Sequence, residues 1–300
     1  MSHAPTLRIY LDGTMLETSR AGTFNFMNVL RHAVQGAGWH IEFHQTSPEA
    51  RHLAPRLDGY ALYHMEPPTH DRALTFRRAY HYPFWQIEPV PQRWRFHVAR
   101  SRFDPQGVDP DEARDFADRL RERVLPGRAP RRDGPVLVPL QGHIRRCRSF
   151  QTMSPVEMLT LTAATGRPVT ATLHPGEHYD AADLQALENL AARHPNLTIG
   201  GNTAMLLRDC AFVVTQNSAV AFDGYLLGKP AVLFAQIDFH HIGLNVADLG
   251  AERALALAET RQSEFAAYLY WFLQQQSVNA SRPDAGERIL AQMRRGGWPI

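Results

Sequence analysis

The sequence predicts an α/β protein made of two Rossmann-like domains that face each other across a cleft, and two observations support this prediction. Short apolar segments, typical of buried strands, alternate with segments whose apolar residues recur at helical spacing. Strands and helices that alternate in this way form parallel sheets covered by helices on both faces. The alternation stops once, at a segment rich in Pro, Gly and Arg over residues 126–135, and then begins again. We therefore expect two domains, over residues 1–130 and 131–300.

Strands and two main helices are expected in the first half. The strands are expected at residues 6–11, 39–44, 58–64 and 83–87. Residues 23–36 carry apolar side chains at helical spacing, and Thr23 is the expected N-cap of this helix. The Gly-containing segment that leads into it is expected to be a loop. A second helix is expected over 111–125, because Asp109 is a natural N-cap and Pro110 suits the first helical position.

The pattern restarts after the linker with a regular alternation. Strands are expected at 136–140, 168–173, 197–199, 211–215 and 230–234, and helices at 154–165, 181–193, 203–208, 218–227, 250–276 and 284–295.

Composition indicates a globular protein with no membrane-spanning segment. Hydrophobic residues make up 44% of the chain and charged residues 21%, which is typical of globular domains. A net charge of +2 argues against a strongly basic nucleic-acid binder. No segment approaches 18 apolar residues, and the N-terminus lacks the apolar core of a signal peptide. We expect a cytoplasmic protein whose two cysteines, Cys147 and Cys210, are reduced thiols.

Three polar segments follow expected strands in the second half. They are Gln141-Gly142-His143, "TLHPGEHY" at 172–179, and Thr215-Gln216-Asn217-Ser218. Open α/β sheets bind ligands beyond the carboxyl ends of their strands. We call these three segments the polar corners. The sequence predicts that they lie at one edge of one sheet and form a binding site.

Two of these corners suit a phosphate group. Pro175 ends a strand and holds His174 extended, so the imidazole can point toward a ligand and donate to a phosphate oxygen. Asn217 and Ser218 are good N-caps for a helix whose N-terminus favours an anion, and Thr215 adds a hydroxyl. Each corner also has a purely structural interpretation, as a strand-end histidine bonded to backbone and as a simply capped helix.

The first half offers acidic residues at its own strand ends. Asp12 and Glu17 lie in the corner after the first strand, and Glu66 follows strand 58–64. One of them is a candidate general base that would deprotonate an acceptor hydroxyl. Each can also be structural. We rank Glu17 slightly ahead of Asp12 and Glu66.

Common metal and nucleotide motifs are absent from the sequence. Asp109-x-Asp111 resembles a metal-binding pair, but it follows a loop, so helix capping explains it. The Gly228-Lys229-Pro230 turn lacks the remaining residues of a Walker loop. His240-His241 lacks metal-ligand spacing with an acid. We expect no metal and no cofactor.

Four segments of the second half together resemble one protein family. They are "VLVPLQGH" (136–143), "TLHPGEHY" (172–179), "VVTQNSAVAFDGYLLGKPAVLF" (213–234) and "AYLYWFLQQQ" (267–276). This set resembles the capsular polysaccharide biosynthesis proteins related to the Kps-type β-Kdo transferases. Those proteins are GT-B glycosyltransferases that use CMP-Kdo. The resemblance covers residues 135–280, and the first half shares only the general layout.

The resemblance implies roles for individual residues. The family's His-Pro pair corresponds to His174 and Pro175, and its Asn-Ser corner to Asn217 and Ser218. Its Gly-Lys-Pro turn corresponds to Gly228, Lys229 and Pro230, and its Pro-Leu-Gln strand end to Pro139, Leu140 and Gln141. It implies that His174 and Ser218 hold the donor's phosphate, with the nucleotide against the C-terminal domain and without a metal. It also implies that the final helices, 262–295, pack back across the cleft.

One departure from the family leaves alternatives open. The family usually has an acidic residue shortly after Pro-Leu-Gln, whereas this chain has the basic run "GHIRRCRSF". Arg145, Arg146 and Arg148 can bind a phosphate or an acidic saccharide, or form a solvated loop. CDP-glycerol glycerophosphotransferases of teichoic-acid synthesis share the His-Pro and Ser-rich corners. A non-catalytic accessory protein of capsule assembly and a sugar-nucleotide epimerase of the same fold are further alternatives.

The sequence thus favours a metal-independent GT-B glycosyltransferase that moves a sugar, such as Kdo, from a cytidine-based nucleotide-sugar. The acceptor would be lipid-linked or a polysaccharide. We expect no nucleic-acid partner. The arginines within "RAPRR" (128–132) and in the basic run would allow peripheral contact with the inner face of a bacterial membrane or with capsule machinery.

Overall fold

The computed structural model describes residues 4–127 and 129–300, and the chain forms two compact units. Unit 1 contains the chain up to Ser101 together with Phe272–Ile300, and unit 2 contains Arg102–Trp271. Arg128 of the expected linker lies outside the described residues. Over residues 4–127 and 129–300, no helix is long and apolar enough to cross a membrane.

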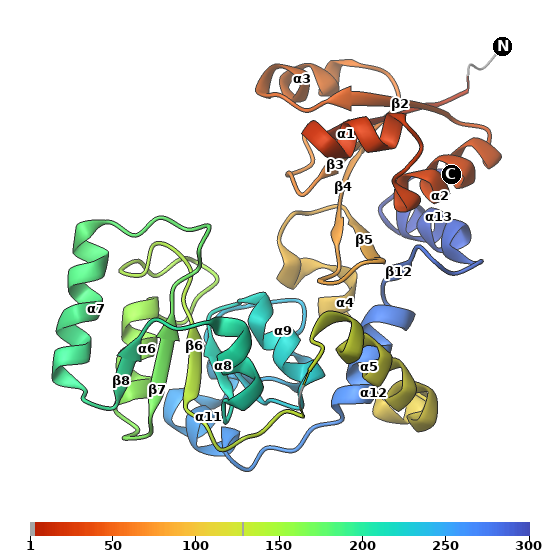
Figure 1. Cartoon of the computed structure of the whole chain (residues 1–300). Helices are drawn as coiled ribbons and strands as arrows, with labels where there is room; N and C mark the ends of the chain where they lie inside the picture. Colours follow the sequence, from red (N-terminus) through yellow and green to blue (C-terminus); the bar gives the residue numbers. More distant parts are fainter. Residues whose placement is uncertain (1–3, 128) are drawn as a thin grey trace. The chain divides into compact units, whose positions relative to one another are not determined.

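Unit 1 is built on a six-stranded sheet in the order β12-β5-β4-β3-β1-β2 (Figure 1). The pairs β1–β2, β1–β3 and β3–β4 are parallel, whereas β5 is antiparallel to both β4 and β12. Its elements are β1 (Thr6–Leu11), α1 (Gly13–Arg20), α2 (Asn25–Gly36), β2 (His40–Gln45), α3 (Pro48–Leu53), β3 (Tyr60–His64), β4 (Ala73–Arg78), β5 (Phe84–Glu88), α4 (His97–Arg100), β12 (Val278–Asn279) and α13 (Ala285–Arg295).

Two local predictions for unit 1 were wrong. The segment expected to be a loop after β1 contains helix α1. Its polar residues hide the helical pattern, because the Ser19 hydroxyl donates to the Met15 carbonyl at 2.6 Å, one turn back, and the side chain is buried. Thr23 is not an N-cap, since α2 begins at Asn25 with Phe24 in the capping position.

Strand β4 was not predicted, although it lies inside the sheet between β3 and β5. Its first four residues are buried, and the following Arg77 and Arg78 make its sequence look like a surface segment. The sequence predicted neither antiparallel pairing of this sheet. Strand β5 returns from β4 along a short connection, which explains why that pair is antiparallel, and β12 adds to the other side of β5 from the end of the chain.

Unit 2 is built on a second six-stranded sheet, entirely parallel, in the order β11-β10-β9-β6-β7-β8 (Figure 1). Its elements are α5 (Pro110–Val124), β6 (Val136–Pro139), α6 (Pro155–Ala163), β7 (Val169–Thr172), α7 (Ala181–Arg193), β8 (Leu197–Ile199), α8 (Thr203–Asp209), β9 (Val213–Thr215), α9 (Ala219–Leu226), β10 (Ala231–Leu233), β11 (Leu244–Asn245), α10 (Val246–Leu249), α11 (Ala251–Ala258), α12 (Phe265–Tyr270) and a π-helical turn at Trp271–Gln275. The turn crosses the division between the units, because only Trp271 belongs to unit 2.

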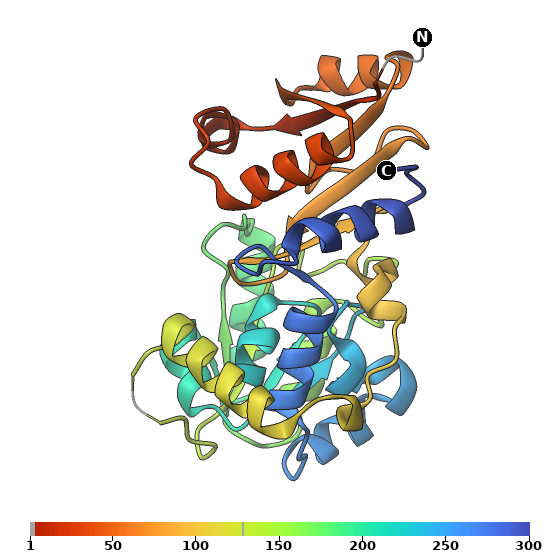
Figure 2. The same ribbon diagram turned by 90° about the vertical axis from the view of Figure 1, so that its right-hand side faces the viewer.

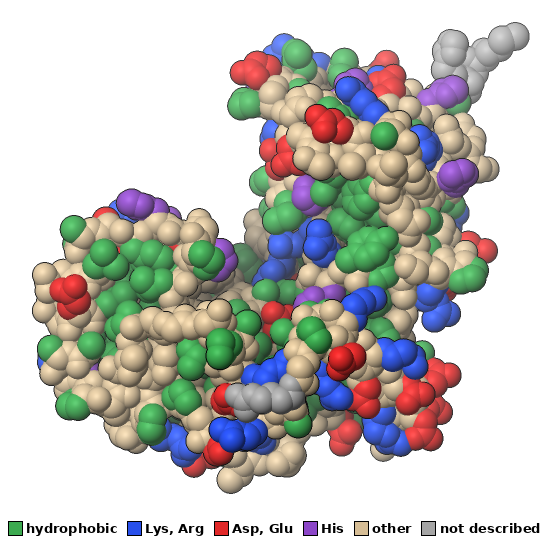
Figure 3. All heavy atoms as spheres, in the orientation of Figure 1, with side chains coloured by type: hydrophobic (Ala, Val, Ile, Leu, Met, Phe, Trp, Pro, Cys, Tyr) green, Lys and Arg blue, Asp and Glu red, His purple; other side chains and the backbone are tan. Residues whose placement is uncertain are grey.

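The order of strands in unit 2 is the Rossmann order. Counted along the chain from β6, the strands lie as 6-5-4-1-2-3 across the sheet. The prediction of a parallel sheet with alternating helices in the second half is therefore confirmed. Helix α5 begins as expected, because the Asp109 carboxylate accepts from the N–H groups of Asp111 and Glu112, both at 2.9 Å. Acidic and basic side chains are interspersed over the face of α5 (Figure 3).

The two units divide at Ser101 instead of near residue 130. Helix α5 packs on α12 and α9, and the Tyr270 hydroxyl donates to the Glu112 carboxylate at 2.8 Å. The segment that resembles a linker is bonded into unit 2, since the Arg131 and Gly134 N–H groups each donate to carbonyls at the end of α8, at 2.9 Å. Pro and Gly therefore mark a fixed surface loop here.

The chain returns to unit 1 after α12. Strand β12 pairs with β5, and α13 packs beside α2 (Figures 1 and 2). The apolar side chains of this segment belong to the hydrophobic core of unit 1; they are Val278, Ala280, Ala285, Ile289, Met293 and Trp298. The expected return of the C-terminal helices is confirmed for α13, whereas α12 remains in unit 2.

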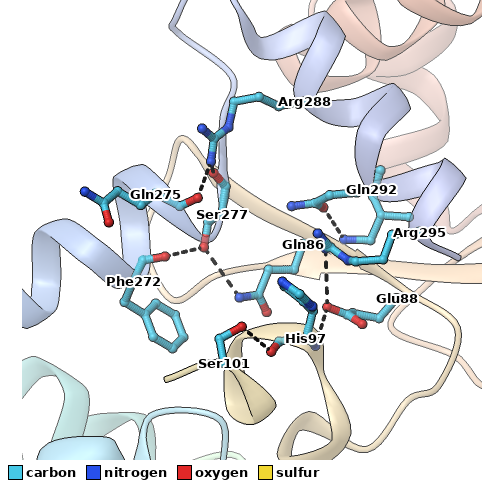
Figure 4. A network of polar contacts seen from close by, with 11 residues as sticks. Gln86, Glu88, His97, Ser101, Phe272, Gln275, Ser277, Arg288, Gln292 and Arg295 are labelled. Atoms are coloured by element: carbon cyan, nitrogen blue, oxygen red, sulfur yellow. Dashed lines mark hydrogen bonds and ion pairs between the residues drawn. The ribbon is translucent and has the colours of Figure 1, made fainter. Parts of the chain in front are cut away.

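A buried polar network fixes this returning segment (Figure 4). The Gln292 side chain accepts from the Ile87 N–H at 2.8 Å, so α13 completes the hydrogen bonding of β5. Arg288 donates to the Ser277 carbonyl at 2.9 Å. Arg295 of α13 lies 4.0 Å from the carboxylate of Glu88, which is 3% exposed and also accepts from the His97 N–H at 2.9 Å. Buried polar groups need their hydrogen-bond partners, so these contacts fix the position of the C-terminal segment against β5.

Candidate functional site

The three polar corners follow three adjacent strands of unit 2. Gln141 follows β6, His174 follows β7, and Ser218 follows β9, in a sheet where β6 lies between β9 and β7. All three strands are parallel, so their carboxyl ends lie at one edge. The gap between β6 and β9 is the point at which the strand order reverses, and ligands of Rossmann sheets bind at such a point.

His174 is exposed, and one of its ring nitrogens is already held. The Gly176 N–H donates to His174 Nδ1 at 3.1 Å. Because Nδ1 accepts, the neutral ring carries its proton on Nε2. The second nitrogen is therefore a hydrogen-bond donor, and Pro175 continues the turn that fixes the ring. This arrangement suits an acceptor such as a phosphate oxygen.

Tyr179 fixes the His174 corner to the neighbouring strand end. The His174 N–H donates to the Tyr179 hydroxyl at 3.0 Å, and that hydroxyl donates to the Leu140 carbonyl at 3.3 Å. Burial raises the pKa of Tyr179, so the phenol keeps the proton that it donates. One side chain thus joins the corners after β6 and β7. Tyr179 lies within the "TLHPGEHY" motif, but the sequence pattern assigns it no role.

Ser218, the N-cap of α9, and Thr215 have different parts in the third corner. The Ser218 oxygen accepts from the Val220 N–H at 3.3 Å, which leaves its own proton for another acceptor. Thr215 is 0% exposed, and its hydroxyl donates to the Pro139 carbonyl at 3.3 Å. Thr215 therefore stabilises the corner and offers no donor to a ligand. Asn217 is half-buried, and Ser218 rather than Asn217 is the N-cap.

The loop after β6 crosses the carboxyl edge of the sheet toward β10. Gln151 forms a β-bridge with Ala235, and Gln216 Nε2 donates to the Met153 carbonyl at 3.0 Å. Among the described residues, the buried Oε1 atoms of Gln141 and Gln216 have no hydrogen-bond partner. Such buried polar atoms are costly unless water or a ligand bonds to them.

The basic run in this loop is partly neutralised. Arg145 pairs with Asp180 at 2.8 Å and with Asp183 at 2.7 Å. Arg148 stacks on the ring of Phe150, with 4.8 Å between the guanidinium carbon and the ring centroid. Arg146 is exposed and, with His143 and the Arg145 ion pairs, lines a small pocket of about 190 Å³. Of the three arginines, Arg146 is the most available to an anionic ligand.

Lys229 has a structural role. It is 0% exposed, and its ammonium donates to the carbonyls of Arg131 and of Cys210, the latter at 2.8 Å. Burial lowers the pKa of Lys229. The Gly228-Lys229-Pro230 turn therefore joins the segment before β6 to the end of α8. Both cysteines are free thiols, Cys147 exposed and Cys210 buried.

An acidic side chain does reach the corner after β6, but from another loop. A Cβ atom on Gly142, which is buried, would lie 2.4 Å from Glu177 Oε2. The Glu177 carboxylate therefore lies directly against Gly142, three residues beyond His174. The sequence has no acidic residue directly after Pro-Leu-Gln, because the acid that lies there comes from the loop after β7.

Asp12 and Glu66 lie at the carboxyl edge of the unit 1 sheet. They follow β1 and β3, which are adjacent parallel strands at the point where the strand order of this sheet reverses. The Glu66 carboxylate already has two partners: it forms an ion pair with Arg51 at 2.9 Å and accepts a hydrogen bond from the Thr46 hydroxyl at 2.7 Å. Asp12 is exposed and makes no side-chain hydrogen bond to the described residues of α1. Glu17 is exposed on α1, beyond the strand end.

His64, which the sequence analysis did not select, lies at the same edge. Its half-buried ring packs on Phe76, with 5.0 Å between the ring centroids. Burial lowers the pKa of His64, and the nearby Asp12 carboxylate opposes this effect. The two side chains therefore interact electrostatically. Only the pairing of β3 with β1, which no local sequence pattern reveals, brings them together.

No family model and no curated protein matches the chain, but solved structures do. The β-Kdo 2,7 transferase of Thermosulfurimonas dismutans KpsC is 12% identical over 97% of this chain and 99% of that one, with a TM-score of 0.50. The β-Kdo 2,4 transferase of the same KpsC is 12% identical over 89% and 90%, with a TM-score of 0.43. A Methanocaldococcus jannaschii UDP-GlcNAc 2-epimerase is 9% identical over 97% and 99%, with a TM-score of 0.37.

At this level of identity the likeness concerns the fold. The first of these structures is similar over nearly the whole of both chains, including unit 1, where the sequence resemblance was only general. The predicted fold class is confirmed: the chain has the α/β fold of GT-B glycosyltransferases, with two Rossmann-like units and a C-terminal segment that returns to the first.

Proposed function

We propose that this protein is a glycosyltransferase of surface polysaccharide synthesis that uses a nucleotide-sugar donor. One observation carries the proposal: an exposed histidine with a fixed Nε2 donor and a helix-capping serine flank the strand-order reversal of a Rossmann sheet. Both groups can donate to the phosphate of a leaving nucleotide. Donors fixed in place stabilise developing negative charge effectively, because they need no rearrangement during the reaction.

In the proposed reaction, unit 2 binds the donor and unit 1 binds the acceptor. The acceptor hydroxyl oxygen forms a bond to the anomeric carbon, and the bond from that carbon to the phosphate oxygen breaks. The nucleotide leaves with the electron pair, stabilised by His174 and Ser218, and a carboxylate takes the hydroxyl proton. CMP-Kdo is the first donor to test, and the acceptor would be lipid-linked or a polysaccharide. The residues named here require no bound metal.

Among the three acids, we propose Asp12 as the base. It lies at the strand-order reversal of the unit 1 sheet, and it is exposed next to His64. Glu66 is held by Arg51 and Thr46, so accepting a proton would weaken an existing ion pair. Glu17 projects from α1 instead of from a strand end. The geometry thus favours Asp12 over Glu17, reversing the ranking from sequence.

Thermal-shift measurements with CMP, CDP, UDP, GDP and ADP test the donor. A ligand at 100 times its dissociation constant stabilises a protein by about 2.7 kcal/mol, which is a readable shift. We expect cytidine nucleotides to shift the melting temperature. A shift with CDP and turnover of CDP-glycerol would instead indicate glycerophosphate transfer. A shift with UDP or GDP alone would contradict a cytidine donor. If no nucleotide produced a shift, the proposal would fail in favour of an accessory protein.

Replacing Asp12 tests the base. We expect Asp12→Asn to lower turnover by about 100-fold or more, since general-base catalysis contributes about 10²–10⁴. Asn is also a good N-cap, so α1 should remain folded. The control is Glu17→Gln, which removes the same charge five residues later and should leave turnover nearly unchanged. Steady-state kinetics with saturating donor distinguish the two. Loss of activity in the Glu17 variant alone would assign the base to Glu17.

A further inference from the structure

The loop after β7 carries an acidic residue, Glu177, whose place in the sheet suggests a ligand. In the Rossmann order of unit 2, β6 is the first strand and β7 the second. In Rossmann sheets that bind dinucleotides, an acidic side chain after the second strand accepts hydrogen bonds from the ribose hydroxyls. Glu177 follows the second strand here. Its position in the sheet therefore matches that of a ribose-binding acid.

Gly142 makes this position accessible to the carboxylate. The Glu177 Oε2 atom lies where a Cβ on Gly142 would make a 2.4 Å contact, so any other residue would push the carboxylate away. Gly142 follows β6 directly after Gln141. The carboxylate thus lies at the end of the first strand, beside the strand-order reversal, although its backbone belongs to the second strand's loop.

The Glu177 carboxylate also has no hydrogen-bond or ion-pair partner among the described residues, and its side chain is exposed. Its two acidic neighbours along the chain are both used: Asp180 caps α7 and pairs with Arg145, and Asp183 completes the capping box and pairs with the same arginine. Glu177 is thus free to accept hydrogen bonds from a ligand.

We propose that Glu177 binds the 2′- and 3′-hydroxyl groups of the ribose in the donor nucleotide. This inference rests on the proposed function, because it takes the phosphate to lie at His174. A carboxylate repels phosphate, so its partners must be neutral donors, and the ribose hydroxyls are the neutral donors nearest a nucleotide's phosphate. His174 and Glu177 lie on one turn, since the Glu177 N–H donates to the His174 carbonyl at 3.1 Å. One short loop would then hold both ends of the ribose phosphate.

Calorimetric titration of the full chain with CMP and UMP, each compared with its 2′,3′-dideoxy form, tests the inference. We expect the wild-type protein to bind the ribose form at least tenfold more tightly. The Glu177→Ala variant should bind the ribose and the dideoxy forms with the same affinity. That affinity should equal the one with which the wild-type protein binds the dideoxy form. Gly142→Ala should reproduce this loss by displacing the carboxylate. The control, Glu188→Ala, removes an exposed acid of α7 with the same change in charge and should keep the wild-type preference.

The outcomes separate this inference from the proposed function. If Glu177→Ala binds nucleotide and still prefers the ribose form, Glu177 does not contact the hydroxyls, and the proposed function stands. If that variant keeps the preference but loses transfer, Glu177 acts in the chemistry and the inference is overturned. If the wild-type protein binds none of the four nucleotides, both proposals fail. If Glu177→Ala loses the preference for the ribose form but still binds the dideoxy form, the inference is supported. The retained binding also shows that the variant is folded.

Discussion

His174→Ala should lower transfer severely and leave both units folded. The imidazole is exposed and contributes nothing to the hydrophobic core of unit 2, so its removal should not change the melting temperature measurably. In the proposed reaction its Nε2 donor stabilises the leaving phosphate. Loss of one such preorganised donor lowers turnover by about 10²–10³. Steady-state assays with a donor identified by thermal shift measure this loss.

His174→Gln is the matched variant for this experiment. A glutamine amide reaches about as far as the imidazole Nε2 and can donate a hydrogen bond, although it lacks the fixed orientation that Gly176 gives the ring. We expect it to recover part of the lost activity. Normal turnover by His174→Ala would rule out the assignment of the phosphate to this corner. A large drop in the melting temperature would instead show that the ring is structural.

Removing Phe272–Ile300 should prevent unit 1 from folding. This segment supplies an edge strand, a helix and several apolar side chains of the unit 1 core, including Ile289 and Trp298. Loss of even one large buried side chain costs about 2–5 kcal/mol, a large part of the stability of a typical domain. Hydrogen exchange of the β1 and β3 amides should become fast, while the strands of unit 2 should remain protected.

A pair of substitutions on α13 provides the control. Ile289→Asp places an uncompensated charge in the core and should reproduce the truncation. Ala291→Asp introduces the same side chain on the exposed face of the same helix and should change stability little. Protected β1 amides in the truncated chain would show that unit 1 folds without its C-terminal segment.

The corner residues of unit 2 illustrate how far a sequence can lead. Ser218 caps α9, and the Asp109 carboxylate caps α5. Caps are local features, specified by a few adjacent residues. The sequence therefore identified Asp109 and narrowed the cap of α9 to Asn217 or Ser218. It also predicted that the segments after β6, β7 and β9 share an edge, because parallel strands have their carboxyl ends together. Their functional roles remain predictions.

Other features of the site depend on contacts between distant residues. The sequence predicted that the Thr215 hydroxyl donates a hydrogen bond to a phosphate, but this hydroxyl donates to the carbonyl of Pro139, 76 residues away. Glu177 lies against Gly142 because β7 pairs with β6. Asp12 interacts with His64 because β1 pairs with β3. No pattern within one segment specifies such pairs.

The sequence by itself determined the α/β class, the order of most helices and strands, and the polar corners that end the strands of unit 2. These features follow from side-chain periodicity and capping, which act over a few residues. Only the tertiary structure decided that α5 belongs to unit 2, that β12 and α13 complete unit 1, and that Glu177 reaches the end of β6. These features follow from burial of apolar faces and from pairing of strands. Both bring together segments that lie far apart along the chain, so no pattern within one segment specifies them.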